Sequence, residues 1–177
     1  MYFRQFEQGY YDLKGDGKEK LVTDLMTRVK VREKVIDEAS LYDKYDVPSG
    51  ERPEDTAFKH FGSSQYHWVI LMTNNITDAY YEWPMSEQTF ETFLIDKYAE
   101  PGAIHHYEVS QSSGRTSAQG PDDYSYLVEV NSDATGAQSV SNREYEQRLQ
   151  DERRQIQLLN PSYLNTFLEE FNELVRT

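Results

Sequence analysis

Residues 50–74 read GERPEDTAFKHFGSSQYHWVILMTN, and this stretch decides the fold. Pro53 suits the first position of a helix, the two acidic residues after it suit the positive end of the helix dipole, and Gly62 suits its end. Apolar residues at helical spacing lie between these signals: Ala57, Phe58 and Phe61. We therefore expect a short amphipathic helix between Pro53 and Gly62.

A second helix is predicted over residues 66–72, where apolar side chains lie on nearly every side. Ser63 or Ser64 can cap its start, and the pair Asn74-Asn75 offers a left-handed exit. A helix without a polar face has to be buried, so this segment should lie in the core.

The residues on either side of these two helices predict a strand and a third helix. Tyr45 and Val47 alternate as in a strand, and residues 48–50 supply a turn. Ser86 suits the cap of a helix with apolar residues at three-to-four spacing: Phe90, Phe93, Leu94 and Tyr98. The aromatic run at residues 80–84 is expected to pack this helix on the core.

Residues 99–140 predict a β-hairpin extension. Segments 107–109 and 124–130 have the composition of strands. Residues 110–123 between them are rich in Ser, Gly and other polar residues, as in a mobile loop.

Residues 141–177 predict two helices separated by Asn-Pro-Ser at 160–162. In the first, apolar residues nearly seven apart leave a narrow seam that needs a partner helix: Tyr145, Leu149, Ile156 and Leu159. The second has a full amphipathic face: Leu164, Phe167, Leu168, Phe171, Leu174 and Val175. The pair folds as a hairpin or binds separate neighbours, and the sequence leaves both open.

These segments predict an α+β fold. Its small core has the order β-α-α-β and, with the helix that follows, lies in residues 41–98. The other parts are an N-terminal arm of undecided conformation at 1–40, the β-hairpin extension at 99–140 and the C-terminal helical segment at 141–177.

The composition excludes several kinds of partner. Lys and Arg number 18 against 31 Asp and Glu, and the net charge of -13 repels nucleic acid and anionic lipid. A mean hydropathy of -0.82 is typical of disordered chains, but an aromatic content of 14% is not, so much of the chain should fold. The 14 tyrosines exceed what a small core holds, which favours large protein interfaces.

The sequence contains few signals of the cellular compartment in which the protein folds. The chain has no cysteine, which excludes disulfides, thiolate zinc sites and cysteine nucleophiles and fits assembly in a reducing cytoplasm. Residues 1–7 lack the pattern of a signal peptide, and no later apolar run approaches bilayer length. We expect neither export by that route nor insertion in a membrane.

Residue types that support catalysis occur without a specific arrangement. His105 and His106 are adjacent in an expected strand, so they should point to opposite faces and away from one shared metal. His67 lies in the predicted buried helix, where a structural imidazole is the simpler interpretation. A carboxylate pair such as Glu54 with Glu82 has no specificity among 31 acidic residues. We expect no enzyme, no metal site and no cofactor.

One aromatic cluster leaves two interpretations open. Its members are Trp68, Tyr80, Tyr81 and Trp83. They can stack on a sugar ring or pack in the core and in protein interfaces, and packing is favoured.

A longer string of residues shows a family resemblance. It comprises Gly50 through Glu54, Phe61-Gly62, Trp68 through Met72, Asn74, Asp78, Tyr80-Tyr81, Trp83 and a helix that ends in Lys97-Tyr98. Its order of strand, turn, short helix, glycine and second helix resembles a lysin motif. The whole string resembles the lysin-motif-containing baseplate wedge subunit of T-even-type contractile-tailed bacteriophages, over nearly the whole chain. Ala79 departs from the proline of that family, and residues 51–53 interrupt the Gly-Asp-Thr run of sugar-binding lysin motifs.

The resemblance implies a non-enzymatic structural subunit in the tail baseplate of a virion. It implies contacts with the sheath-initiator subunit, large wedge scaffold subunits and neighbouring wedge copies, which help to join wedges into a ring. The alternative is a peptidoglycan-binding or other glycan-binding lysin-motif module. Residues expected in the core or in interfaces are Trp68, Leu71, Asp78, Tyr80, Tyr81, Trp83, Leu149, Ile156, Phe167 and Phe171.

The dense apolar centre and the charged ends suggest a rigid clamp with arms that become ordered on binding. In the free chain, residues 53–75 should be protected from hydrogen exchange. Residues 1–40 and 141–177 should gain protection only with wedge partners.

Overall fold

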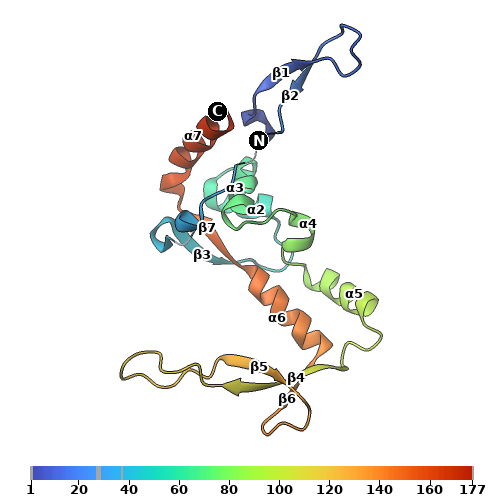
Figure 1. Ribbon diagram of the computed structural model, residues 1–177, viewed down its shortest axis with the longest axis vertical. Helices are drawn as coiled ribbons and strands as arrows, with labels where there is room; N and C mark the ends of the chain where they lie inside the picture. The colour runs from blue at the N-terminus through green and yellow to red at the C-terminus, as the bar shows by residue number, and fades with distance from the viewer. Residues whose placement is uncertain (1, 27–28, 37, 177) are drawn as a thin grey trace. The chain divides into compact units, whose positions relative to one another are not determined.

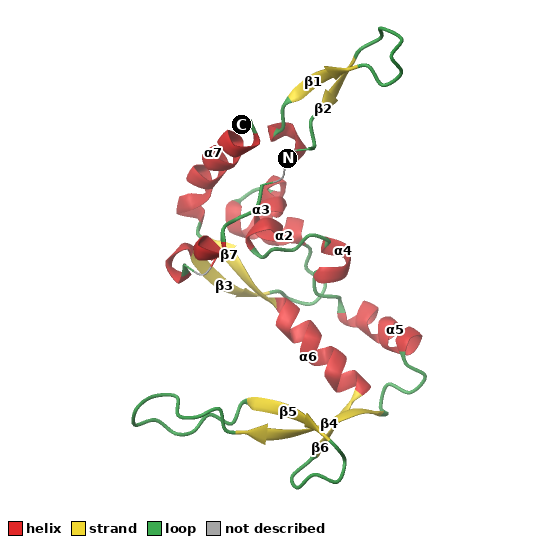
Figure 2. Cartoon of the chain, in the orientation of Figure 1, coloured by secondary structure: helices red, strands yellow, loops and turns green. Residues whose placement is uncertain are grey.

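The computed structural model describes residues 2–26, 29–36 and 38–176 and mixes helices with strands, which confirms the predicted α+β class (Figures 1 and 2). Within these residues the helices are α1 (Glu33–Ile36), α2 (Pro53–Phe61), α3 (His67–Thr73), α4 (Ala79–Glu82), α5 (Glu87–Lys97), α6 (Asn142–Arg154) and α7 (Leu164–Val175). The strands are β1 (Gln8–Tyr11), β2 (Lys20–Thr23), β3 (Tyr42–Asp46), β4 (Ile104–Gln111), β5 (Tyr126–Val130), β6 (Gln138–Ser141) and β7 (Gln155–Leu159). None of the helices described is both long and apolar enough to cross a membrane.

The chain divides into two compact units. Residues 1–84 and 153–177 form the first unit, and residues 85–152 form the second. The first unit therefore joins the two ends of the sequence, while the second is one continuous stretch.

The central sheet of the first unit pairs β3 with β7 in antiparallel register, from Tyr42 opposite Leu159 to Asp46 opposite Gln155. The strand and two helices expected from residues 41–74 are present as β3, α2 and α3 (Figure 1). The strand that completes the sheet comes from residues 155–159, far along the chain. The prediction that Ile156 and Leu159 share one helix with Tyr145 is therefore wrong, because α6 ends at Arg154.

Local signals form α2 much as the sequence predicts. Pro53 occupies its first turn, and the Asp55 carboxylate accepts a hydrogen bond from the Arg52 N–H at 3.2 Å. Gly62 ends the helix in the left-handed region, at φ 76°, and its N–H donates to the Phe58 carbonyl. Of the three apolar residues expected at helical spacing, Ala57 is buried but Phe58 is exposed, and Thr56 is buried on the helix as well.

The predicted burial of the second helix is confirmed, and α3 contributes side chains to two hydrophobic clusters. Cluster one holds Phe6, Tyr42, Trp68, Val69, Leu159, Leu164, Phe171 and Val175. Cluster two holds Val47, Ala57, Ile70, Trp83, Ile156 and Leu158. Because α7 supplies three members of cluster one, its apolar face packs within this chain. The C-terminal helix is thus part of the core, which corrects the expectation of a free arm there.

Asn74 joins the end of α3 to β7. Its side-chain amide donates to the Gln157 carbonyl at 2.7 Å, and its amide oxygen accepts from the Gln157 N–H at 2.8 Å. The side chain therefore acts like one residue of an added strand and satisfies two main-chain groups of β7.

Replacing Asn74 with alanine should lower the free energy of unfolding of the first unit by about 1–2 kcal/mol, because two main-chain groups of β7 lose their partners. Chemical denaturation of the purified protein measures the change. Gln157→Ala is the matched control and should have a smaller effect, since both bonds use the main chain of Gln157. An equal loss in the two variants would contradict this role of Asn74.

The second unit contains a three-stranded sheet with the order β5-β4-β6, in which both pairings are antiparallel. Its predicted hairpin corresponds to β4 and β5, and β6 is an additional strand.

The Ser86 hydroxyl accepts from the Thr89 N–H and caps α5, which buries Phe90 and Leu94, as predicted for this helix. On α6, buried Glu146 accepts hydrogen bonds from Lys97 at 2.6 Å and from the Tyr98 hydroxyl at 2.7 Å.

Candidate protein interaction site

The predicted site residues separate into buried and exposed groups. Trp68 is only 5% exposed and its ring lies 4.7 Å from that of Phe171 and 6.1 Å from that of Phe167. Ile156 is buried in β7, Leu71 is half-buried beside cluster two, and Leu149 is half-buried on α6. These side chains pack within the chain.

Trp83 and the two tyrosines before it have opposite environments. Trp83 is buried, and its indole N–H donates to the Glu51 carbonyl at 2.8 Å. Tyr80 and Tyr81 are 82% and 67% exposed. The four aromatic residues therefore do not form one sugar-stacking platform, because both tryptophans are in the core.

A network of short hydrogen bonds fixes the two exposed tyrosines on α4. The Asp78 carboxylate accepts from the Tyr80 N–H at 2.9 Å and caps the helix. In return, the Glu82 carboxylate accepts from the N–H groups of Thr77 at 2.6 Å and Asp78 at 3.0 Å. The rings of Tyr80 and Tyr81 meet edge to face, with centroids 4.9 Å apart. We call these two residues the tyrosine pair.

The hydrogen bonds that the Glu82 carboxylate accepts depend on its ionised form. Hydrogen bonds from the main-chain N–H of Asp78, and then of Thr77, hold its pKa below the usual value. A carboxyl group with a lowered folded-state pKa contributes stability above its unfolded-state pKa and loses it as pH falls through the lowered value. Acidification should therefore loosen the turn that presents the tyrosine pair.

The N-terminal residues present a second exposed apolar surface that the sequence did not resolve. Strands β1 and β2 form a two-stranded hairpin in which Tyr10 opposes Leu21 and Gly9 opposes Val22. Exposed apolar side chains lie along it and its flanks: Tyr10, Tyr11, Leu13, Leu21, Val22, Leu25 and Met26. A lone hairpin is marginally stable in water, so a partner that covers it would stabilise it.

A cleft of about 430 Å³ lies in the first unit beside α3. Its lining includes Trp68, Leu71 and Met72 from α3 together with Tyr2 and Phe3. The Trp68 indole nitrogen is buried without a hydrogen-bond partner. The lining is mostly apolar, which fits a side chain of a partner better than a charged ligand.

A buried carboxylate holds the start of α2. Glu51 accepts from Lys59 at 2.5 Å, Thr56 at 2.7 Å and the Tyr45 hydroxyl at 2.9 Å. Burial acts to raise the pKa of Glu51, but the hydrogen bonds from Lys59, Thr56 and Tyr45 lower it overall. Both carboxylate oxygens have donors from α2 or β3, so the role of Glu51 here is to hold structure.

The two adjacent histidines do not behave as the sequence predicts. A register shift between Ile104 and His106 forms a bulge in β4, and it brings the Nδ1 atoms of His105 and His106 to 2.8 Å. The prediction that they point to opposite faces is therefore wrong. His105 stacks on the Tyr145 ring at 4.0 Å. Across residues 2–26, 29–36 and 38–176, no group of three or more His, Asp or Glu side chains has the geometry to hold a metal.

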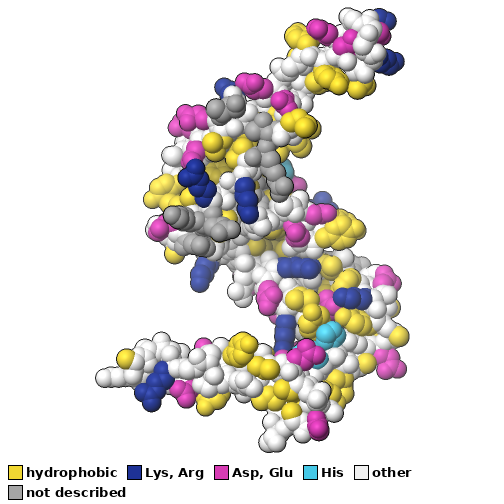
Figure 3. Space-filling view, in the orientation of Figure 1, with side chains coloured by type: hydrophobic (Ala, Val, Ile, Leu, Met, Phe, Trp, Pro, Cys, Tyr) yellow, Lys and Arg dark blue, Asp and Glu magenta, His cyan; other side chains and the backbone are white. Residues whose placement is uncertain are grey.

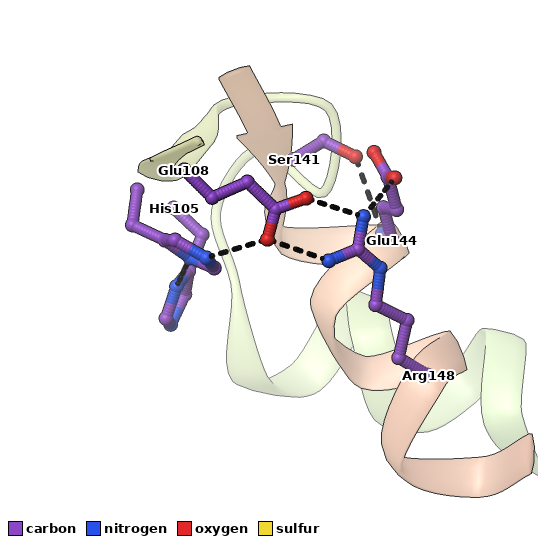
Figure 4. Close-up of polar contacts among 6 residues, drawn as sticks. His105, Glu108, Ser141, Glu144 and Arg148 are labelled. Carbon is purple, nitrogen blue, oxygen red and sulfur yellow. Dashed lines mark hydrogen bonds and ion pairs between the residues drawn. The ribbon is translucent and has the colours of Figure 1, made fainter. Parts of the chain in front are cut away.

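An ion-pair cluster joins β4 to α6 in the second unit (Figure 4). The Arg148 guanidinium donates to both oxygens of Glu108, at 2.8 and 2.9 Å, and to Glu144 at 2.7 Å. Glu108 is 6% exposed, and His106 Nε2 lies 3.7 Å from it. The pairing uses both carboxylate oxygens, which leaves Glu108 poorly placed for acid-base chemistry.

A sequence profile of the family described as Base plate wedge protein 53 matches residues 1–117, more than half of the chain. The chain belongs to this family. A relative in Enterobacteria phage T4, described as baseplate wedge protein gp53, is 36% identical over 58 residues. The aligned part covers 33% of this chain and 30% of that relative.

Family membership confirms the baseplate wedge family that the sequence resembles, and it makes the chain a component of a virion tail baseplate. The finer likeness of residues 41–98 to a lysin motif stays a prediction. The tyrosine pair, the β1–β2 hairpin and the cleft beside α3 all lie within the residues that the family profile matches.

Proposed function

We propose that this protein is a non-enzymatic structural subunit that binds neighbouring wedge proteins and helps to join wedges into the baseplate ring. Its partners are the sheath-initiator subunit, large wedge scaffold subunits and copies in adjacent wedges. The observation that supports this proposal most is the tyrosine pair, because two large aromatic side chains lie in solvent on a turn whose main chain is held by hydrogen bonds. Tyrosine side chains have few rotatable bonds, so they lose little conformational entropy on binding, and they are enriched in protein interfaces.

The polar clusters of the described residues support the same function. The carboxylates of Glu51, Glu108 and Glu146 each accept bonds from Lys or Arg, and these contacts hold secondary-structure elements together. Exposed apolar side chains on α4 and on the β1–β2 hairpin offer separate contact surfaces. Several modest contacts on one chain raise the effective concentration of each, so a wedge joint gains stability from their combination.

Co-expression with the other wedge proteins of the same phage, followed by size-exclusion chromatography, tests this function. The protein should elute with at least one wedge protein at a mass above that of the free chain. Elution as a free chain in every combination would contradict the proposal. Purified cell-wall sacculi provide the comparison for the glycan-binding alternative, and no retention on them is expected.

Replacing the tyrosine pair by Tyr80→Ser and Tyr81→Ser should weaken binding to a wedge partner at least about tenfold, because aromatic anchors supply much of the energy of an interface. The fold should be unchanged, since both rings are exposed. Binding is measured by titration calorimetry with the partner found by co-expression. Tyr163→Ser, at another exposed tyrosine, is the matched control. Equal affinities of the control and the double variant would contradict a role for the pair.

A further inference from the structure

Strand β5 forms an unprotected edge of the sheet in the second unit. It pairs with β4 on one side, from Tyr107 opposite Val130 to Gln111 opposite Tyr126, and no described strand pairs with its other side. Natural edge strands are usually protected by proline, lysine or a bulge. The sequence of β5, YLVEV, has neither residue, and its register with β4 is regular. Its outer main-chain groups can therefore pair with another strand.

The two faces of this sheet differ in charge. Tyr126, Val128 and Val130 of β5 share one face with Tyr107 and Val109 of β4. None of these five side chains belongs to either buried hydrophobic cluster, and Tyr126 is 59% exposed. Hydrophobic side chains are visible along this hairpin in Figure 3. One face of the edge is thus apolar and uncharged.

The opposite face contains two carboxylates in direct register. Glu129 of β5 lies opposite Glu108 of β4, an arrangement that destabilises a strand pair unless a cation compensates it. Arg148 compensates Glu108 with two hydrogen bonds, whereas Glu129 is exposed and no described ion pair includes it. A cation placed beside Glu129 would relieve this repulsion.

The charge of the whole unit indicates the sign of its partner. Residues 85–152 contain thirteen Asp and Glu against four Lys and Arg, a formal net charge of -9. All four cations are already in ion pairs within the unit: Lys97 with Glu146, Arg115 with Asp122, Arg143 with Glu91, and Arg148 with Glu108. A second copy of this chain would bring the same negative charge, so the complementary partner is cationic.

We infer that the free edge of β5 accepts an extended segment of a neighbouring baseplate protein in which apolar residues alternate with Lys or Arg. The added strand pairs with the main chain of residues 126–130. Its apolar residues then extend the face of Tyr126, Val128 and Val130, and its cations lie beside Glu129. The inference rests on the proposed function for the source of the segment, but the edge and its charge can be tested on the isolated protein.

The probe is a short synthetic peptide in which valine and lysine alternate, added to the full-length protein. It should bind, and the amides of residues 126–130 should gain protection from hydrogen exchange. Glu129→Lys should weaken binding about five- to tenfold, because an attractive cross-strand pair becomes a repulsive one. Asp96→Lys changes the net charge of the same unit equally and should retain most of the affinity. A peptide with alternate main-chain amides methylated should bind much more weakly.

Four results with the peptide probe would overturn the inference. They are no binding of the probe, binding without protection at residues 126–130, equal weakening by the two lysine variants, and equal binding of the methylated peptide. Dimerisation of the free chain through β5, seen by size-exclusion chromatography, would make a second copy the occupant and also overturn it. If a complex with wedge proteins forms but the amides of residues 126–130 gain no protection from hydrogen exchange, this inference is refuted and the proposed function stands. If no wedge complex forms but the probe binds as expected, the proposed function fails and the edge site stands.

Discussion

Replacing Phe171 with alanine should lower the free energy of unfolding of the first unit by about 3–5 kcal/mol. The side chain is 2% exposed and lies against Trp68, with ring centroids 4.7 Å apart, and near Tyr2 and Phe6 at 5.6 and 6.3 Å. Its removal leaves a cavity in cluster one that rigid aromatic neighbours cannot fill. Thermal and chemical denaturation of the isolated protein measure the loss.

Leu174→Ala provides the matched control on the same helix. Leu174 is 49% exposed, so its truncation should cost less than about 1 kcal/mol. This pair of variants also separates two descriptions of the C-terminus. If α7 were a free arm that becomes ordered on binding, both variants would leave the stability of the isolated protein unchanged. A large effect of Phe171→Ala alone requires α7 to be folded on the core before any partner binds.

Helices α2, α3, α5 and α7 could be predicted because their signals are local. Gly62 ends α2, and Ser86 caps α5 through the Thr89 N–H, so each boundary depends on residues within a turn. The apolar face of α7 is likewise visible in the spacing of Leu164 and Phe171. What this face contacts is not visible, because Trp68 lies about a hundred residues earlier in the sequence.

Strand β7 could not be predicted from its own residues. Ile156 follows Leu149 at a spacing of seven, which is typical of a coiled-coil seam, and the charged residues before it favour a helix. Pairing with β3 instead satisfies the main chain of residues 155–159 and buries Ile156, Leu158 and Leu159. Such long-range pairing overrides local preference. Strand β6 was missed for a similar reason, since Gln-Ser-Val-Ser has little strand character without β4 beside it.

The residues of the candidate site could be predicted from the sequence, but which of their side chains are buried and which are exposed could not. The sequence alone predicts a packing or interface role for the run Tyr80-Tyr81-Glu82-Trp83. The spacing of these residues does not show which ring is buried. A hydrogen bond from Trp83 to the distant Glu51 carbonyl accompanies its burial, while the short helix α4 leaves both tyrosines in solvent. The bulge that joins His105 and His106 has no sequence signal either, because it depends on the pairing of β4 with β6.

Replacing Arg148 with alanine should lower the free energy of unfolding of the second unit by about 2–3 kcal/mol. This is less than the loss expected when a fully buried ion pair is broken, because the Arg148 side chain is 40% exposed. The variant leaves the Glu108 carboxylate, 6% exposed, without the two hydrogen bonds at 2.8 and 2.9 Å. His106, whose Nε2 lies 3.7 Å away, is the remaining neighbour able to compensate when protonated. Hydrogen exchange of the amides of β4 measures the change in this unit alone.

The effect should depend on pH in a defined direction. Hydrogen bonds from Arg148 hold the pKa of Glu108 below its usual value. The pair therefore stabilises the unit above the unfolded-state pKa of the carboxyl group, and this contribution is lost as pH falls through the lowered value. The difference between the natural protein and Arg148→Ala should accordingly be largest near neutral pH and should shrink as the pH falls below about 4.

Arg143→Ala is the control that tests whether burial of the carboxylate partner causes the loss of stability in Arg148→Ala. Arg143 lies on the same helix and donates two hydrogen bonds to Glu91, at 2.5 and 2.7 Å, so its pairing geometry matches that of Arg148. Both partners of this control pair are about half exposed, and water replaces the lost bonds. Exchange in β4 should therefore be unchanged in Arg143→Ala. Equal changes in the two variants, or an Arg148→Ala effect that does not vary with pH, would show that the buried carboxylate does not control the stability of this unit.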